Sequence, residues 1–232
     1  MVNLFQEGIS LRARLLRKFF YRIWKSFVIV RVQKYIEVVQ SEGDGPTDVP
    51  GPAVILCNLK HIRDLYVLMY LFREKEFSFV GLRSLEKMKT FKRLASFNRV
   101  IFLNPQKKMY SFLKEILVSL RNFNRAIILF PKFEFDISKE LIIDPSVVVR
   151  IAMMASVPIV PVSITWGSSQ TPKCNVTIGK RCFVSPASAE FRDIFFRRKG
   201  TRKFSRLDRD ELKMAAERIF SKLEPVDGSN LS

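Results

Sequence analysis

The sequence predicts an α/β domain in which helices flank a mostly parallel sheet, with a basic amphipathic helix ahead of it. Short, continuous apolar runs alternate with segments of helical pattern from residue 53 onward. Strands that are buried on both faces of a parallel sheet have this unbroken apolar character. The composition, 47% hydrophobic and 27% charged, supplies enough apolar residues for the core of a globular chain.

The first expected element lies within residues 1–27, where bases and apolar residues separate on opposite sides of a helical projection. The basic side holds Arg14, Arg17, Lys18, Arg22 and Lys25, and the apolar side holds Leu15, Leu16, Phe19, Phe20, Ile23, Trp24 and Phe27. No acidic residue occurs between residues 8 and 36. This pattern predicts a helix lying in a membrane interface, with Trp24 near headgroup level. The alternative is an amphipathic helix packed on its own domain.

Residues 28–224 are expected to form the α/β domain, and residues 225–232 a polar tail. Val-rich composition predicts two strands, at 28–32 and 35–39. Three Gly and three Pro predict a loop at 41–52. Apolar runs then predict strands at 53–57, 77–80 and 100–103, and the segments between them predict helices at 64–72 and 84–97.

The second half of the chain continues this alternation. Helices are predicted at 107–121, 145–155 and 209–223, and strands at 126–130, 159–164 and within 175–184. Pro145 stands at the first helical position, where proline is favoured. The longest uncharged stretch, 151–172, contains Pro158, Pro161 and Gly167, so a helix followed by a buried strand explains it better than a membrane span. Bases and Phe residues alternate over 192–206, which predicts a second membrane contact or, alternatively, a solvated basic loop.

Charge and cysteine content limit the class of partner. The formal net charge of +18 favours polyanions such as anionic lipid headgroups, phosphorylated substrates or nucleic acid. No zinc spacing, aromatic-basic RNA signature or basic zipper occurs, so nucleic acid is not expected and lipid or phosphate is favoured. Cys57, Cys174 and Cys182 form no paired framework or metal motif, which indicates a reducing compartment. With one histidine in the chain, no metal site is expected.

Polar residues follow three of the predicted strands. In an open parallel sheet, functional sites collect at the carboxyl ends of the strands. The residues in question are Asn58, His61 and Asp64 after the strand at 53–57, Asn104 after the strand at 100–103, and Lys132 after the strand at 126–130. We therefore expect these side chains to surround one cleft.

The order of these blocks resembles the glycerolipid acyltransferases, a family that includes the lysophosphatidic acid acyltransferases. That family has a strand followed by N-H-x-x-x-x-D, then a strand ending in an Arg, then F-P-E-G-T-R, and then V-P-I-V-P-V. Here Asn58 and Asp64 match the outer positions of the first block, Phe130-Pro131 matches the start of the third, and residues 157–162 match the last in full. The resemblance extends over about residues 28–224 and implies the same α/β fold.

The sequence departs from the family pattern where the family's catalytic residues stand. Leu59 occupies the position of the His that serves as general base, and Lys132-Phe133-Glu134-Phe135 occupies the position of E-G-T-R. Asn104-Pro105 stands where the Arg is expected. His61 lies two residues beyond the family position and three before Asp64. At that spacing the two side chains face each other on one helical turn and are able to form a hydrogen bond.

The resemblance implies a peripheral membrane enzyme that transfers an acyl chain from a thioester, acyl-CoA or acyl-carrier protein, to a hydroxyl of a lysophospholipid or related glycerolipid. In such an enzyme we expect His61 to take the place of the missing base, with Asp64 as its partner and with Lys132, Asn58 and Asn104 at the acceptor phosphate. It implies no bound cofactor. The expected location is the cytoplasmic face of the cell membrane, peripheral or monotopic, in contact with anionic phospholipid.

Each assignment has a structural alternative. His61 is equally described as a surface residue in a basic loop, and Asp64 as a helix cap or as the ion-pair partner of Arg63 or Lys60. Lys132 is one of 40 basic residues in the chain. For the chain as a whole, the alternative is a non-catalytic member of the family that binds lipid or an acyl carrier at a membrane surface.

Overall fold

The computed structural model describes residues 26, 30–41, 51–57, 59, 61–73, 77–82, 99–103, 109–130, 144–167, 173–196, 207 and 209–221. In this part of the chain, seven strands form one sheet in the order β1-β7-β6-β2-β5-β3-β4. The strands are β1 (Ile36–Ser41), β2 (Val54–Cys57), β3 (Phe77–Leu82), β4 (Arg99–Leu103), β5 (Ala126–Leu129), β6 (Ile159–Trp166) and β7 (Cys174–Ile178). Every pairing is parallel except β6 with β7. The predicted mostly parallel sheet is confirmed.

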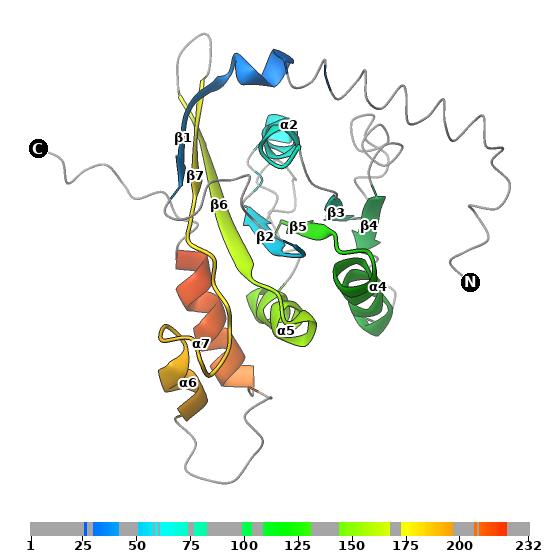
Figure 1. Cartoon of the computed structure of the whole chain (residues 1–232), viewed down its shortest axis with the longest axis vertical. Coiled ribbons are helices and arrows are strands. Elements are labelled where there is room, and N and C mark those ends of the chain that lie inside the picture. The colour runs from blue at the N-terminus through cyan, green and yellow to red at the C-terminus, as the bar shows by residue number, and fades with distance from the viewer. Residues whose placement is uncertain are drawn as a thin grey trace, which may run out of the picture.

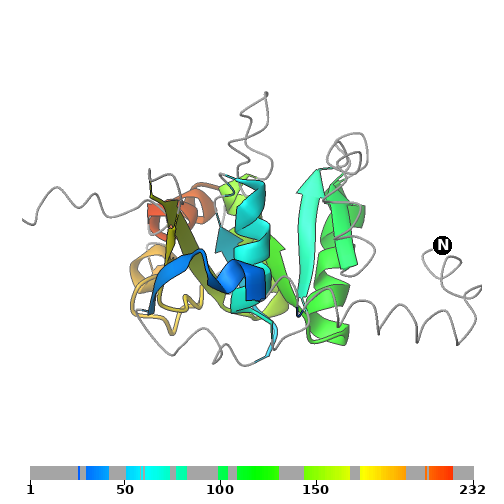
Figure 2. The ribbon, with the colours of Figure 1, turned by 90° about the horizontal axis from the view of Figure 1, so that it is seen from above.

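Helices cover both faces of this sheet (Figure 1). They are α2 (Ile62–Leu71), α4 (Met109–Asn122), α5 (Pro145–Ala155), α6 (Arg192–Phe196) and α7 (Arg209–Phe220). Among them, α2 lies alone on one face, while α4, α5 and α7 lie on the other. Seen from above, α2 lies over the middle of the sheet, with β1 to one side and β3 and β4 to the other (Figure 2).

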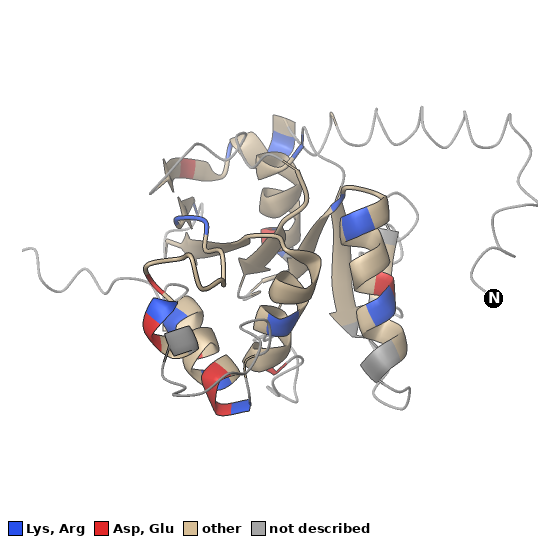
Figure 3. Ribbon diagram, turned by 60° about the horizontal axis from the view of Figure 1, so that its bottom comes forward, with Lys and Arg blue, Asp and Glu red and all other residues tan. Residues whose placement is uncertain are grey.

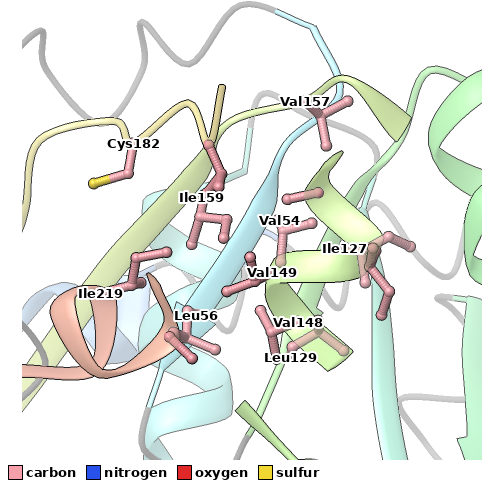
Figure 4. Packing of buried hydrophobic residues seen from close by; sticks show 14 of the residues in the cluster. Val54, Leu56, Ile127, Leu129, Val148, Val149, Val157, Ile159, Cys182 and Ile219 are labelled. Atoms are coloured by element: carbon pink, nitrogen blue, oxygen red, sulfur yellow. The ribbon is translucent and has the colours of Figure 1, made fainter. Parts of the chain in front are cut away.

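The apolar strand residues divide between two cores because successive side chains of a strand point to opposite faces. On β2, Ile55 and Cys57 pack under α2, and Val54 and Leu56 pack against α5 and α7. The same alternation divides β5. Figure 4 shows the core on the α5 and α7 side, where β2 meets Val149 of α5 and Ile219 of α7. Burial on both faces is the reason that these strands carry unbroken apolar sequence.

Local signals set the bounds of α5. The Asp144 carboxylate caps its first turn by accepting a hydrogen bond of 2.8 Å from the Ser146 N–H. The side-chain hydrogen bond of Ser146, and secondly the hydrogen bond from its backbone N–H, lower the pKa of Asp144 below its ordinary value. Pro145 occupies the first turn, and Ser156 ends the helix in the left-handed conformation with φ 56°. The predicted span of 145–155 is confirmed.

Helices α6 and α7 are joined by an ion pair, in which an Arg218 Nη1–H donates a hydrogen bond of 2.7 Å to Asp193 Oδ1. Figure 3 shows that acidic and basic residues mix along α7, whose outer face is that of an ordinary solvated helix. Helix α6 was not predicted from the sequence. Ile194 within it and Phe191 just before it are wholly buried against the α5 and α7 core.

The pairing of β6 with β7 brings the backbones of Pro161 and Gly179 close together. Pro161 lies in the middle of β6 and has no N–H, but its carbonyl accepts a hydrogen bond of 2.9 Å from the Gly179 N–H. A Cβ atom at Gly179 would lie 2.8 Å from Pro161 Cγ. This separation is too short for a real side chain, so the proline is accommodated because its neighbour is glycine.

The structure corrects one predicted strand. Residues 28–32 were expected to be extended, but residues 30–33 are helical and β1 begins at Ile36. A helical turn exposes Val30 at 61% while it buries Val32 at 8%, so the local β-preference of valine yields to core packing. The strands at 53–57, 77–80, 100–103, 126–130 and 159–164 and the helices at 64–72, 107–121 and 209–223 are confirmed within a few residues. The predicted helix at 84–97 lies outside the described residues, as does the amphipathic helix expected within 1–27 except for Ser26, which is helical and exposed.

Candidate active site

The carboxyl ends of β2, β5 and β4 lie at one edge of the sheet, because the strands from β2 to β4 are mutually parallel. These strands end at Cys57, Leu129 and Leu103, and α2 begins at the same edge, just after β2. Asn58, Asn104 and Lys132 follow those three ends but lie outside the described residues. Their grouping around one cleft therefore stays a prediction.

Asp64 is a fully buried carboxylate in the first turn of α2, with 0% of its surface exposed. Its Oδ2 accepts a hydrogen bond of 2.8 Å from the backbone N–H of His61, and the Asp64 N–H donates one of 3.0 Å to the His61 carbonyl. The carboxylate at the third helical position thus reaches back to the N–H of the N-cap residue His61, as in a helix cap, the structural alternative that the sequence left open for Asp64. The two residues do meet within one turn, through the backbone of His61.

Trp166 is the second partner of this carboxylate. Its indole Nε1–H donates a hydrogen bond of 2.6 Å to Asp64 Oδ1. Trp166 is the last residue of β6 and is half-buried. With His61 on Oδ2 and Trp166 on Oδ1, both oxygens of a buried charge accept a hydrogen bond, which is the condition for keeping such a charge in a core. Sequence reasoning missed Trp166, which is separated from Asp64 by 102 residues in the chain.

The imidazole of His61 lies at the exposed rim of this arrangement. Its ring meets the Trp166 indole edge to face, with 6.4 Å between ring centroids and 81° between ring planes. This distance falls within the range of interacting aromatic pairs. The chain therefore presents its one histidine beside a tryptophan, within one helical turn of a buried carboxylate.

Leu59, at the position of the family's His, has the opposite environment. It has 0% exposure and belongs to the core beneath α2. A side chain at this position packs among apolar residues instead of facing a substrate. An imidazole placed there requires a change in the path of the chain to reach solvent.

Two buried thiols lie near the same carboxylate. Burial, and secondly the negative charge of Asp64, raise the pKa of Cys57 well above its ordinary value. The same two causes raise the pKa of Cys174 to about 11. Both thiols are therefore protonated and unreactive at neutral pH. Among the described residues, no three His, Cys, Asp or Glu side chains are grouped so that they could hold a metal ion.

The predicted membrane contacts cannot be compared with the fold. Arg14, Arg17, Lys18, Phe20, Arg22, Trp24 and Lys25 all lie outside the described residues, as do residues 197–206 of the second basic segment. Within the parts of the chain that are described, no helix combines the length and the hydrophobicity needed to span a bilayer.

Comparisons with known proteins agree with the resemblance noted in the sequence. A family model described as "Acyltransferase" matches residues 31–165. The crystal structure of the 1-acyl-sn-glycerophosphate (LPA) acyltransferase PlsC from Thermotoga maritima superposes with a TM-score of 0.55 at 16% sequence identity, covering 97% of this chain and 88% of that one. No curated protein matches significantly by sequence. Because the family model matches more than half of the 232 residues, the chain belongs to the acyltransferase family.

Proposed function

We propose that the protein transfers an acyl chain from an acyl thioester to a hydroxyl of a lysophospholipid or related glycerolipid, at an anionic membrane surface. The observation that carries the proposal is the acyltransferase match over residues 31–165. An exposed imidazole at the carboxyl edge of the sheet supports it, since that edge is where α/β proteins bind ligands. Acyl-CoA and acyl-carrier protein are the candidate donors.

In the proposed reaction, the imidazole of His61 accepts the proton of the acceptor hydroxyl while the hydroxyl oxygen attacks the thioester carbonyl carbon. The tetrahedral intermediate collapses as the carbon–sulfur bond breaks, and the imidazolium returns its proton to the departing thiolate. An ester and a thiol are formed, and no further reactant is needed. The Asp64 carboxylate, in the same helical turn, stabilises the imidazolium electrostatically. Lys132, Asn58 and Asn104 are the proposed ligands of the acceptor phosphate.

A second candidate function is a non-catalytic one, binding of lipid or acyl carrier. Burial of Leu59 at the position of the family's base favours it, because leucine cannot take a proton. The hydrogen bonds of Asp64 favour it as well, since His61 engages the carboxylate through its backbone N–H. In this alternative the turn is retained to hold α2 against β6.

Acyl transfer by the purified full-length chain separates the two candidates. Labelled acyl-CoA and acyl-carrier protein are supplied with lysophospholipid in anionic vesicles, and product is quantified for the wild type, His61→Ala and the control Phe123→Leu. Phe123 is an exposed ring beyond the end of α4, stacked with Arg125. Loss of a general base lowers the rate by about two to four orders of magnitude, so His61→Ala should lose transfer while Phe123→Leu keeps it.

Two other results contradict parts of the proposal. No transfer by the wild type, with vesicle binding intact, favours the non-catalytic candidate. Transfer that survives His61→Ala removes His61 as the base. Leu59→His then tests whether the site lacks only the family's base. We expect little gain, because the E-G-T-R turn and the Arg are also replaced and Leu59 is buried.

Membrane association is tested separately with vesicles of anionic and neutral composition. Each basic residue near an anionic surface contributes about 1 kcal/mol to binding, so full-length protein should sediment with anionic vesicles and release with salt. A chain that lacks residues 1–26 should stay largely in the supernatant. Equal sedimentation of the two chains would exclude this segment as the anchor.

A further inference from the structure

Trp166 stands out because it joins two parts of the candidate site that are far apart in sequence. It ends β6, whereas His61 and Asp64 belong to the entry into α2. Its indole contacts both residues, the carboxylate by a hydrogen bond of 2.6 Å and the imidazole by an edge-to-face ring contact. Its own place is fixed by the sheet, where it pairs in register with Cys174 of β7.

We propose that Trp166 is a positioning residue for His61. The indole N–H holds the Asp64 carboxylate, the carboxylate holds the backbone of His61, and the indole ring limits the orientations open to the imidazole. The role in catalysis rests on the proposed function, because His61 must be the base for its orientation to affect acyl transfer. The orientation itself does not depend on activity and is measurable in an inactive protein.

Two features distinguish this role from ordinary packing. Trp166 packs against the core beneath α2 but stays half-buried at the end of a strand, next to an exposed imidazole. Its one polar atom is directed at the one carboxylate buried in the first turn of α2. The strand, the carboxylate and the imidazole thus form a rigid connection from the sheet to the rim of the site, and catalytic groups depend on rigid support of this kind.

The chain's composition makes the test direct. His61 is the only histidine, and Trp24 and Trp166 are the only tryptophans. Isotope-labelled histidine therefore gives a single imidazole signal in the NMR spectrum of the full-length protein in detergent. In a Trp24→Phe chain, all tryptophan fluorescence comes from Trp166, so its emission reports the contact between the indole and the imidazole.

The variants separate the hydrogen bond from the ring. Trp166→Phe keeps an aromatic ring but removes the N–H donor, and Trp166→Leu removes both. The control is Phe123→Leu, which removes a ring at the end of the sheet opposite Trp166. We expect the imidazole signal to shift in both Trp166 variants, most in Trp166→Leu, and to stay unchanged in the control. If the wild type transfers acyl groups, kcat should fall about 10- to 100-fold in the Trp166 variants with KM within about twofold, as expected for a misplaced catalytic group.

An imidazole signal that is the same in the wild type and both folded Trp166 variants overturns the proposal. Should Trp166→Leu fail to fold, fluorescence of the Trp24→Phe chain decides: the emission of Trp166 should change when His61→Ala is introduced in that background. Identical emission with and without His61 overturns the proposal. If the wild type shows no acyl transfer but the imidazole and fluorescence responses appear, the proposed function fails and the positioning of His61 stands.

Discussion

The two faces of the sheet are built from the same strands but have different contents. The face beneath α2 is covered by α2 and by the helical turn at 30–33, and it contains a buried carboxylate, Asp64, with hydrogen bonds on both oxygens. The opposite face is covered by α4, α5 and α7. Its buried serines, Ser78 of β3 and Ser119 of α4, have hydroxyl oxygens without a hydrogen-bond partner in the described part of the chain. The second face also buries Glu211 of α7, but its two buried hydroxyls have no partner among the described residues, whereas the carboxylate of the first face is hydrogen-bonded on both oxygens.

This difference separates the face that holds the candidate site from the face that supports it. An organised buried charge costs free energy unless its partners stay in place, so it fixes the geometry around it. An apolar face with a few unpaired hydroxyls stabilises the fold without defining the position of any reactive group. Changes on the α2 face should therefore affect both stability and the candidate site, whereas changes on the opposite face should affect stability alone.

The largest expected effect tests whether the two faces stabilise the fold equally. Ile55 and Leu56 are neighbours on β2, both with 0% exposure, and they point to opposite faces. Truncation of such a side chain leaves a cavity, so Ile55→Ala and Leu56→Ala should each lower the free energy of unfolding by about 2–5 kcal/mol. Urea unfolding measures both. A cost well below that range for Ile55→Ala alone would mean that the α2 face is loosely packed.

A smaller loss is expected for Asp64→Ala, which leaves the donors of His61 and Trp166 without their acceptor. An unpaired buried donor costs about 1–3 kcal/mol, and urea unfolding should show a loss in this range. Asp64→Asn is the matched control, because its amide oxygen still accepts one of the two hydrogen bonds, so its loss should be intermediate. Equal stability of Asp64→Ala and the wild type would contradict a capping role for Asp64.

The third effect depends on pH and again concerns the α2 face. Cys174 has its pKa raised from 9.0 to about 11 by burial and by Asp64. Between these values the unfolded chain has lost the thiol proton while the folded chain retains it, so the free energy of unfolding should fall as pH rises. The stabilisation that the protonated Cys174 thiol contributes is constant below pH 9.0 and fully lost above about 11. Unfolding curves of the wild type and Cys174→Ala should diverge only in this window, and parallel curves would contradict the assignment.

The smallest expected effect is a gain, and not a loss, in the free energy of unfolding. Ser119→Ala on α4 removes a buried hydroxyl that has no partner within the described residues. It also introduces the residue with the highest helix propensity. The free energy of unfolding should stay constant or rise by up to about 1 kcal/mol. Thermal unfolding measures it, and a clear loss of stability would show that the hydroxyl has a partner after all.

The sequence predicted the elements of this fold well and the relations between them poorly. Unbroken apolar runs identified β2, β5 and β6 because their strands are buried on both faces, and Pro145 identified the start of α5. The strand expected at 28–32 was wrong, since the burial of Val32 depends on a core that local preference does not reveal. The pairing of Asp64 with its neighbours illustrates the same limit. The spacing of three predicted a contact with His61, but nothing near Asp64 in the chain indicates Trp166.

The contact between Pro161 and Gly179 makes substitutions at these two positions depend on each other. A side chain at Gly179 would lie 2.8 Å from the proline ring, so a mutation there is tolerated only after Pro161 has been exchanged for a residue without that ring. Substitution of Pro161 first is tolerated, because loss of the ring makes room for a side chain at position 179. The carbonyl of residue 161 still accepts the hydrogen bond from the N–H of residue 179. Pro161 therefore sets the order in which substitutions at these two positions are tolerated. Gly179→Ala should be damaging alone and nearly harmless beside Pro161→Ala.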